Sequence, residues 1–126
     1  MRLMLDTTFV IDHLRRDAQA TQLFQRLAEG GDSLYVCDIV VCETYAGTHP
    51  GGQTQVDRFF RFLEFVQPGP DAARQAGAWR AEALRGGRSL SAADALIASA
   101  AEAVGAAVLT RNVRDFALTP VRVETY

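Results

Sequence analysis

Short runs of apolar residues alternate with helical patterns along the whole of this 126-residue chain, and this alternation restricts the possible fold more than any other feature. The short runs have the length of strands, and the run at 3–5 has the composition of a buried strand. Alternating strands and helices predict an α/β fold, with a mostly parallel sheet covered by helices on both faces. The predicted strands are residues 3–5, 33–37, 65–66, 106–109 and 121–123.

Helices are predicted between these strands, and glycine pairs such as Gly30-Gly31 and Gly86-Gly87 end two of them. Asp38 is the predicted N-cap of the third helix, since its carboxylate is able to accept bonds from the first backbone N–H groups. No repeat divides the chain, and 48% hydrophobic residues suffice for one core, so a single domain over residues 1–126 is expected. The predicted helices are residues 8–16, 18–28, 39–46, 53–63, 71–84 and 92–104.

The charged residues restrict the chemistry. All 13 basic residues are arginines, and the formal net charge is -2. Without lysine, mechanisms that depend on a side-chain amine, such as Schiff-base formation or a P-loop lysine, are excluded. Proteins that coat nucleic acids non-specifically are usually basic, so any nucleic-acid contact here has to come from local arginines or through a metal ion.

A cytoplasmic location without membrane contact is expected. No apolar run approaches the roughly 18 residues of a membrane span, and the first residues do not have the pattern of a signal peptide. Cys37 and Cys42 lack zinc-site spacing and are expected to be reduced core residues. His13 and His49 also lack metal-site spacing, so surface or loop positions are expected for both.

Four acidic residues lie where the chain leaves predicted strands or enters predicted helices. Asp6 directly follows the first strand, Glu43 lies in the helix after the second, Asp94 lies in the first turn of a helix, and Asp115 follows the strand at 106–109. In open parallel sheets the ligand site lies beyond the carboxyl ends of the strands. We therefore expect these carboxylates to converge at one edge of the sheet.

Each acid also has a structural interpretation. Asp6 fits the N-cap of the first helix, and the segments that begin at Ser91 and Asn112 fit capping boxes with Asp94 and Asp115. Glu43 stands in an apolar segment, where a carboxylate is costly unless it is paired or binds a metal, although a solvated position is the alternative. Both interpretations stay open at this point.

Carboxylates held close together repel and raise one another's pKa. A hard divalent cation with oxygen ligands, Mg²⁺ or Mn²⁺, relieves that repulsion. One or two such ions also suit phosphoryl transfer, because they stabilise the attacking and leaving oxygens of an in-line displacement.

Four segments resemble the PIN-domain family, and they occur in the family's order over almost the whole chain. The first resembles the family's LDTNVLID opening, the second its Glu followed four residues later by Gly, and the others its SxxDALIA and LxTxNxxDF segments. They are MLDTTFVID at 4–12, VVCETYAG at 40–47, SAADALIA at 91–98 and LTRNVRDF at 109–116.

The resemblance is strongest to VapC-type toxins of toxin–antitoxin systems. It implies a PIN-like three-layer α/β/α fold and an endoribonuclease that depends on Mg²⁺ or Mn²⁺ and hydrolyses RNA. It also implies a homodimer and a cognate VapB-like antitoxin that occupies the active site, with DNA contacted only through that antitoxin. By position, the catalytic, metal-binding carboxylates are Asp6, Glu43, Asp94 and Asp115.

Further residues are candidates for supporting the acids or contacting phosphate. The family often has Asn where this chain has Thr8, which keeps a hydroxyl but loses the amide. Family members differ at the positions of Asn112 and Asp115, so the resemblance leaves open which of the two faces the metal. Exposed arginines are candidate phosphate contacts, with a solvated surface as the alternative. The supporting candidates are Thr7, Thr8, Ser91, Thr110 and Asn112, and the arginines are Arg88 and Arg111, with Arg15, Arg16, Arg85 and Arg114 as further candidates.

Two other functions are compatible with parts of the pattern. A receiver-type or dehalogenase-type phosphoryl enzyme also uses acids on such a sheet, but it needs a lysine beside the metal, which this chain lacks. A non-catalytic or weakly catalytic partner in a DNA-bound toxin–antitoxin complex is the alternative that remains. In that case the antitoxin reads the DNA, because this chain is acidic.

Overall fold

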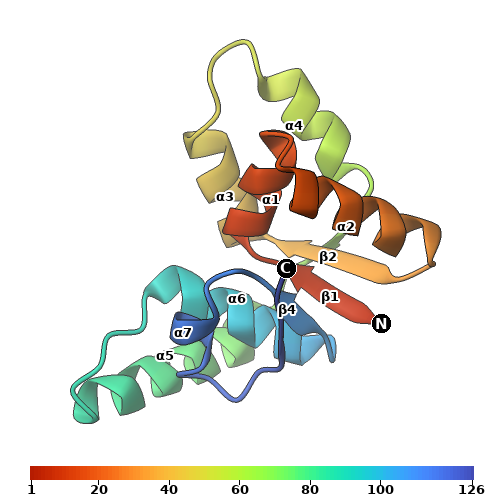
Figure 1. Ribbon diagram of the computed structural model, residues 1–126. Coiled ribbons are helices and arrows are strands. Elements are labelled where there is room, and N and C mark those ends of the chain that lie inside the picture. Colours follow the sequence, from red (N-terminus) through yellow and green to blue (C-terminus); the bar gives the residue numbers. More distant parts are fainter.

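The computed structural model describes residues 1–126, which form one five-stranded sheet with helices on both sides (Figure 1). The strand order is β3-β2-β1-β4-β5, and every neighbouring pair is parallel. Parallel neighbours require a crossover between them, and the helical segments supply it. The strands are β1 (Arg2–Leu5), β2 (Ser33–Cys37), β3 (Glu64–Val66), β4 (Ala107–Leu109) and β5 (Val123–Glu124).

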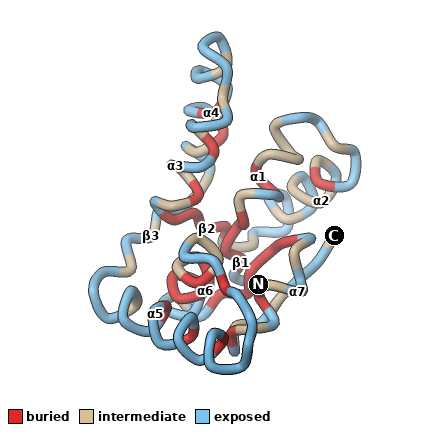
Figure 2. The backbone as a smooth tube through the Cα atoms, turned by 90° about the vertical axis from the view of Figure 1, so that its left-hand side faces the viewer, coloured by how far each residue is buried: buried red, intermediate tan, exposed pale blue.

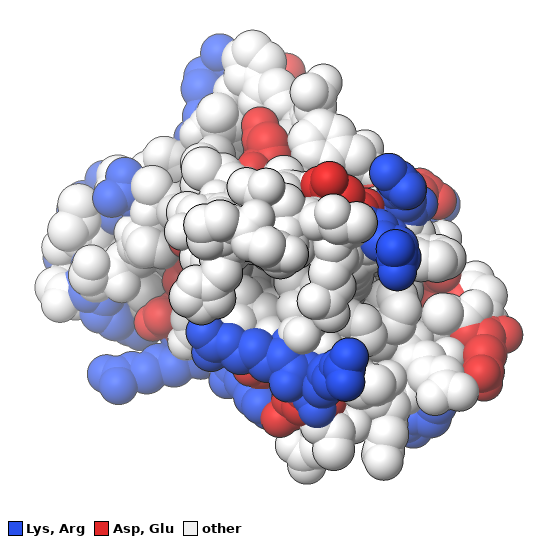
Figure 3. Space-filling model, turned by 90° about the horizontal axis from the view of Figure 1, so that it is seen from above, with Lys and Arg blue, Asp and Glu red and all other residues white.

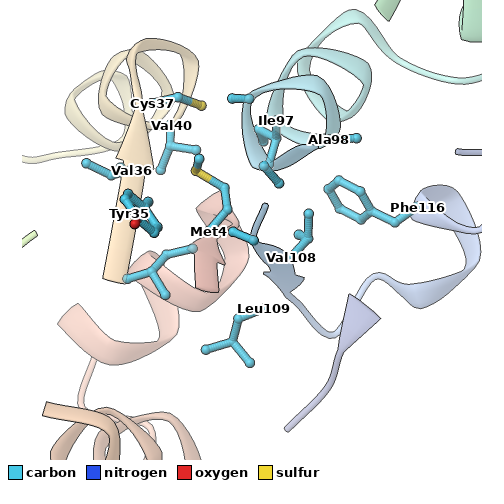
Figure 4. Packing of buried hydrophobic residues seen from close by; sticks show 14 of the residues in the cluster. Met4, Tyr35, Val36, Cys37, Val40, Ile97, Ala98, Val108, Leu109 and Phe116 are labelled. Carbon is cyan, nitrogen blue, oxygen red and sulfur yellow. The ribbon is translucent and has the colours of Figure 1, made fainter. Parts of the chain in front are cut away.

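Strand β1 lies at the centre of the sheet, and its residues from Leu3 to Leu5 are buried. Met4 is fully buried and pairs with Tyr35 on one side and Val108 on the other. Figure 4 shows its side chain among those of the neighbouring strands and of the helices that cover them. A strand covered on both faces consists almost entirely of apolar residues, and for this reason the apolar run at 3–5 predicts a buried strand.

The helices form two layers and one projecting arm. Helices α1 and α2 lie on one side of the sheet, and α5, α6 and α7 lie on the other (Figure 1). Helices α3 and α4 extend away from the sheet, and much of α4 is exposed (Figure 2). The helices are α1 (Thr7–Leu14), α2 (Ala18–Glu29), α3 (Asp38–Ala46), α4 (Gln53–Phe60), α5 (Gly69–Arg85), α6 (Ala92–Ala103) and α7 (Val113–Phe116).

Helix α6 is the main covering helix, and its composition explains its position. Its residues from Ala95 to Ala101 are mostly buried, and most of them are alanine. Small side chains allow close backbone approach, and α6 packs against α5, α3 and the strands β1, β2 and β4. Its first turn is thereby fixed beside the carboxyl ends of those strands.

The predicted α/β architecture is confirmed, with a sheet that is parallel throughout. Several predicted helix and strand ends differ from the observed ones by up to three residues. Three further local differences have a physical reason. Helix α7 was not predicted, because four residues are too short to show helical periodicity. Helix α3 begins at Asp38 with Cys37 as its N-cap, so Asp38 is not the N-cap. The last strand is Val123–Glu124 and not 121–123, since the sheet register pairs Val108 with Val123.

Candidate active site

The four acids predicted from the sequence all lie at the carboxyl edge of the sheet. Asp6 follows β1 directly, and its backbone N–H donates to the Leu109 carbonyl of β4 at 3.1 Å, so the sheet positions it. Glu43 lies in α3, which follows β2, and Asp94 lies in the first turn of α6. Asp115 lies in α7, which follows β4. The charges of the other three acids act on the Asp94 carboxyl, so the four form one electrostatic group.

Asp6 is held by three hydrogen-bond donors. It is 3% exposed, and Oδ1 accepts a bond of 2.8 Å from the Thr7 backbone N–H. Oδ2 accepts bonds from Thr8 Oγ1 at 2.8 Å and from Thr110 Oγ1 at 2.6 Å. Asp6 is therefore the N-cap of α1 and is also oriented by two hydroxyls. Because a carboxylate oxygen has two lone pairs, Oδ1 keeps one of them free for a further partner.

Thr7 joins two of the acids. Its backbone N–H bonds to Asp6, and its hydroxyl donates to Glu43 Oε1 at 2.7 Å. The Glu43 side chain is exposed and not on the buried side of α3, so the sequence argument from a costly buried carboxylate was wrong. The apolar residues around Glu43 in the sequence face other directions of the same helix, and Val40 and Thr44 are the buried ones.

The segment after β4 supports two acids at once. Thr110 is fully buried, and its Oγ1 accepts a bond from the Asn112 backbone N–H at 2.8 Å while it donates to Asp6. The Asn112 side-chain amide donates to Asp115 Oδ2 at 2.8 Å. Asn112 and Asp115 are therefore bonded to each other, and the amide of Asn112 supports the carboxylate of Asp115.

Asp94 is held much more loosely than Asp6. Ser91 is the N-cap of α6, and its Oγ accepts a bond from the Asp94 backbone N–H at 3.0 Å. The pKa of the Asp94 carboxyl is raised from 3.8 to about 6. Burial is the largest cause, and the charges of Asp6, Asp115 and Glu43 act in the same direction. A hydrogen bond from Ser91 lowers the pKa and offsets part of this rise. The carboxyl is thus half-buried among like charges with one hydroxyl partner.

The acidic edge fits a hard divalent cation in its donor chemistry. None of the four carboxylates forms an ion pair with an arginine, so their negative charge is not compensated by the protein. No three acidic, histidine or cysteine side chains stand together as a group that could hold a metal ion, so the carboxylates do not form a ready-made cage. Mg²⁺ keeps several waters and takes only one or two carboxylates, so an open set of oxygen donors suits it better than a cage.

The two arginine candidates differ in their surroundings. Arg88 is exposed in the turn between α5 and α6 and forms no ion pair. Arg111 instead forms ion pairs with Asp12 at 3.0 Å and Asp17 at 3.1 Å. Sequence reasoning did not assign a role to either aspartate, because each is far from Arg111 along the chain.

His13 is half-buried in α1, so the predicted surface or loop position is only partly right. Its ring lies 4.6 Å from that of Phe24 and 4.7 Å from that of Phe59, measured between ring centroids. Burial lowers the pKa of His13, as expected for an imidazole among aromatic rings. The side chain belongs to the packing between α1, α2 and α4 and not to the acidic edge.

The parallel sheet, the helices on its two sides and the carboxylates at its carboxyl edge define a three-layer α/β/α protein with an acidic site. Residues 3–120 match the PIN domain family. The chain therefore belongs to the PIN domain family, and within it the resemblance is to VapC-type proteins.

Individual relatives agree with this assignment. The chain is 31% identical over 117 residues to Ribonuclease VapC19 of Mycobacterium tuberculosis, covering 93% of this chain and 94% of the relative. Among solved structures, it superposes on a chain of DNA-bound VapBC from Salmonella typhimurium with a TM-score of 0.84 at 25% identity, covering 99% and 98% of the two chains. VapBC2 from Rickettsia felis, bound to a promoter DNA fragment, gives 0.85 at 23% identity, covering 100% and 99%.

None of the helices combines the length and the apolar composition that crossing a membrane requires.

Proposed function

We propose that the protein is an endoribonuclease that depends on Mg²⁺ or Mn²⁺, hydrolyses RNA phosphodiester bonds, and is the toxin of a type II toxin–antitoxin pair. The observation that carries this proposal is the set of four carboxylates at one sheet edge with no cationic partner. The relative named Ribonuclease VapC19 supports the nuclease activity. A bound divalent ion would supply Lewis-acid stabilisation of the charge that develops on the phosphate oxygens.

The residues of the chain would hold that ion and orient the substrate. Asp6 offers the free lone pair of Oδ1 in an orientation fixed by its three donors. Glu43 bonds Thr7 through Oε1, and Asp115 bonds Asn112 through Oδ2, so each carboxylate keeps its second oxygen for a cation or a metal-bound water. Asp94 lies among the other charges and gains most from a cation.

The face drawn in Figure 3 does not suit a long nucleic-acid contact. Figure 3 shows the arginine side chains of one face in separate groups with acidic side chains between them, and not as one continuous basic surface. The net charge of -2 agrees with this view. Phosphate contacts would then be few, and they would set affinity and salt dependence but not the choice of RNA sequence. Arg88, exposed and without an ion pair, is the candidate contact.

An antitoxin is the proposed protein partner. The solved structures from Salmonella typhimurium and Rickettsia felis are VapBC complexes bound to DNA, which supports a VapB-like partner that contacts DNA on behalf of the pair. Large apolar side chains remain exposed on this chain, with Phe62 at 74% and Phe65 at 51%, and a partner would cover such surface. We also propose a homodimer and a cytoplasmic location.

Cleavage of a labelled RNA pool by the antitoxin-free protein tests the enzyme. The reaction is run with Mg²⁺, with Mn²⁺ and with EDTA, for the wild type, Asp6→Asn and Glu102→Gln. Glu102 is an exposed acid near the other end of α6 and serves as the matched control. We expect cleavage by the wild type and Glu102→Gln only with metal, and none by Asp6→Asn. Metal-independent cleavage, or full activity of Asp6→Asn, would contradict the proposal.

Operator binding is the second candidate function, favoured by the two DNA-bound structures. A mobility-shift assay with promoter DNA, this protein and its antitoxin tests it. A shift that needs both proteins, from a wild type that cleaves no RNA, would support a regulatory partner and not an enzyme.

A further inference from the structure

Arg111 is the centre of a side-chain cluster beside the acidic edge. Its Nη1 donates to Asp12 Oδ2 at 3.0 Å, and its Nη2 donates to Asp17 Oδ1 at 3.1 Å and to Gln19 Oε1 at 2.8 Å. The guanidinium carbon lies 4.3 Å from the centroid of the Tyr126 ring, a cation–π distance. We call Arg111, Asp12, Asp17, Gln19 and Tyr126 the arginine cluster.

The backbone of Arg111 stands between two residues that hold acids. Thr110 donates to Asp6 Oδ2, and Asn112 donates through its side-chain amide to Asp115 Oδ2. Thr110 and Asn112 are also bonded to each other across Arg111 at 2.8 Å. The bonds of the Arg111 side chain therefore anchor the segment 110–112 to the start of α2 and the second turn of α1.

Tyr126 closes the cluster on the side of α1. Its hydroxyl donates to Asp12 Oδ2 at 2.6 Å, the same oxygen that accepts from Arg111. Its ring meets the Phe9 ring edge-on with centroids 5.0 Å apart. Asp12 and Phe9 belong to α1. Asp6 is the N-cap of this helix, and the hydroxyl donors Thr7 and Thr8 are its first two residues. The cluster thus ties α1 and the segment 110–112 together on both sides of Asp6.

The surroundings of Arg111 disfavour a phosphate contact, which the sequence had offered as its role. One guanidinium with two carboxylates leaves a local charge of -1, which repels a phosphate. Three of its five N–H donors are used, and Tyr126 covers one face of the group. A phosphate would have to displace bonds that already satisfy the planar fork.

We propose that Arg111 and Tyr126 are positioning residues, which fix the orientation of Asp6 and Asp115 through Thr110, Asn112 and α1 and do not contact the RNA. The nuclease part of this statement rests on the function proposed above. Outer partners of metal ligands typically change metal affinity or activity by about 10–100-fold when they are replaced.

The test compares Arg111→Gln with Arg111→Lys, Tyr126→Phe and Arg26→Gln. Arg26 is an exposed arginine on α2 without an ion pair and controls for the loss of one positive charge. Lysine keeps the charge but not the fork, and phenylalanine keeps the ring but not the hydroxyl. Each variant is first melted, and all measurements are made well below the lowest melting temperature. Four quantities are measured: Mn²⁺ affinity by calorimetry, kcat of RNA cleavage with saturating Mn²⁺, RNA affinity in EDTA at several salt concentrations, and amide hydrogen exchange at Asn112.

For Arg111→Gln we expect Mn²⁺ affinity and kcat to fall by about 10–100-fold, with unchanged RNA affinity and salt dependence. Asn112 exchange should accelerate. Arg111→Lys should recover part of each effect, and Tyr126→Phe should show a smaller effect in the same direction. Arg26→Gln should match the wild type in Mn²⁺ affinity and exchange.

Two results would overturn the proposal. Weaker RNA binding with a salt slope reduced by about 1, at unchanged Mn²⁺ affinity, would make Arg111 a phosphate contact. Unchanged exchange at Asn112 would show that the cluster does not hold the segment. If Arg111→Gln does not fold, the same measurements are made on Tyr126→Phe, for which a smaller effect in the same direction is expected. A wild type that neither binds Mn²⁺ nor cleaves RNA would contradict the proposed function, while exchange at Asn112 would still decide whether Arg111 holds the segment.

Discussion

Asp6 and Asp94 lie at the same edge of the sheet, but the protein surrounds them differently. The Asp6 side consists of Asp6 with the donors Thr7, Thr8 and Thr110, and its carboxylate is buried and accepts three bonds. The Asp94 side consists of Asp94 and Ser91, and its half-buried carboxyl has a pKa raised to about 6 by burial and by the neighbouring acids.

This difference separates two requirements of an acidic site. Donors on the Asp6 side fix the direction of one carboxylate before any ligand arrives. On the Asp94 side the repulsion among the carboxylates is left unrelieved in the metal-free protein. A bound cation would relieve that repulsion, so it would be stabilised most on this side. In the proposed metal site, the Asp6 side would supply orientation and the Asp94 side would supply affinity for the cation, and variants can separate the two.

The largest expected effect comes from removing either charge. We expect Asp6→Asn and Asp94→Asn each to lower RNA cleavage by at least about 10³-fold, since a metal site contributes several kcal/mol to the transition state. Their stabilities in EDTA should differ in sign. An amide cannot accept all three bonds at Asp6, so that variant should lose about 1–3 kcal/mol of unfolding free energy. Asp94→Asn should gain about 1 kcal/mol, because it removes a charge from a repulsive site.

Thermal or urea unfolding in EDTA measures the unfolding free energies of Asp6→Asn and Asp94→Asn. Glu102→Gln is the control and should match the wild type. Equal destabilisation by both substitutions would remove the distinction between the two sides. Retained cleavage in Asp94→Asn would exclude Asp94 from the catalytic group.

Removal of one hydroxyl on the Asp6 side should have the next largest effect. Thr110→Val leaves the Asn112 N–H without its acceptor and takes one donor from Asp6. We expect a loss of about 1–3 kcal/mol in stability and of about 10–100-fold in cleavage rate. Thr119→Val is the matched control, since Thr119 is a buried threonine that bonds only to backbone groups. It should lower stability but leave cleavage per folded molecule unchanged; an equal fall in cleavage would make the Thr110 effect a structural one.

The raised pKa of Asp94 predicts that the stability of the metal-free protein depends on pH. The Asp94 carboxyl binds its proton more tightly in the folded state, with a pKa of about 6, than in the unfolded chain, where the pKa is near 3.8. Its contribution is therefore fully favourable below about pH 4 and is lost as the pH rises to about 6. Allowing for solvent screening at a half-buried group, we expect a loss of about 1–2 kcal/mol over this range.

Urea unfolding in EDTA between pH 4 and pH 7 measures this loss as the difference between the wild type and Asp94→Asn. The variant should lack the loss that Asp94 causes, and the two curves should converge toward low pH. Parallel curves over the whole range would show that the Asp94 pKa is not raised.

The smallest effect is expected at Thr8, where the family often has asparagine. Thr8 donates one hydroxyl bond to Asp6 Oδ2, and an asparagine amide is also able to donate there. We expect Thr8→Asn to change cleavage by less than about 3-fold, and Thr8→Val to lower it by about 10-fold. Comparison of kcat for the two variants tests this, and an equal fall in both would mean that the hydroxyl itself is needed.

Much of the fold was predictable from local pattern. Four of the five strands were predicted within one residue at each end. For β1, β2 and β4 the reason is that a strand covered on both faces is apolar throughout. Helix α7 was not predicted because it is too short to show helical periodicity. The predicted capping pair Asn112 and Asp115 nevertheless lies at its position. The acids were found because a parallel sheet places the ends of its strands at one edge.

What the sequence alone determined was the order of elements and the residue types that follow each strand. Which side chains meet was decided by the tertiary structure. The exposure of Glu43 depends on which face of α3 packs against α1 and α6, and apolar neighbours along the chain do not reveal it. The bonds of Arg111 to Asp12 and Asp17 join residues 99 and 94 positions apart, which become neighbours only because β4 pairs beside β1. Strand order is a property of the whole sheet, so local periodicity cannot encode a contact made across it.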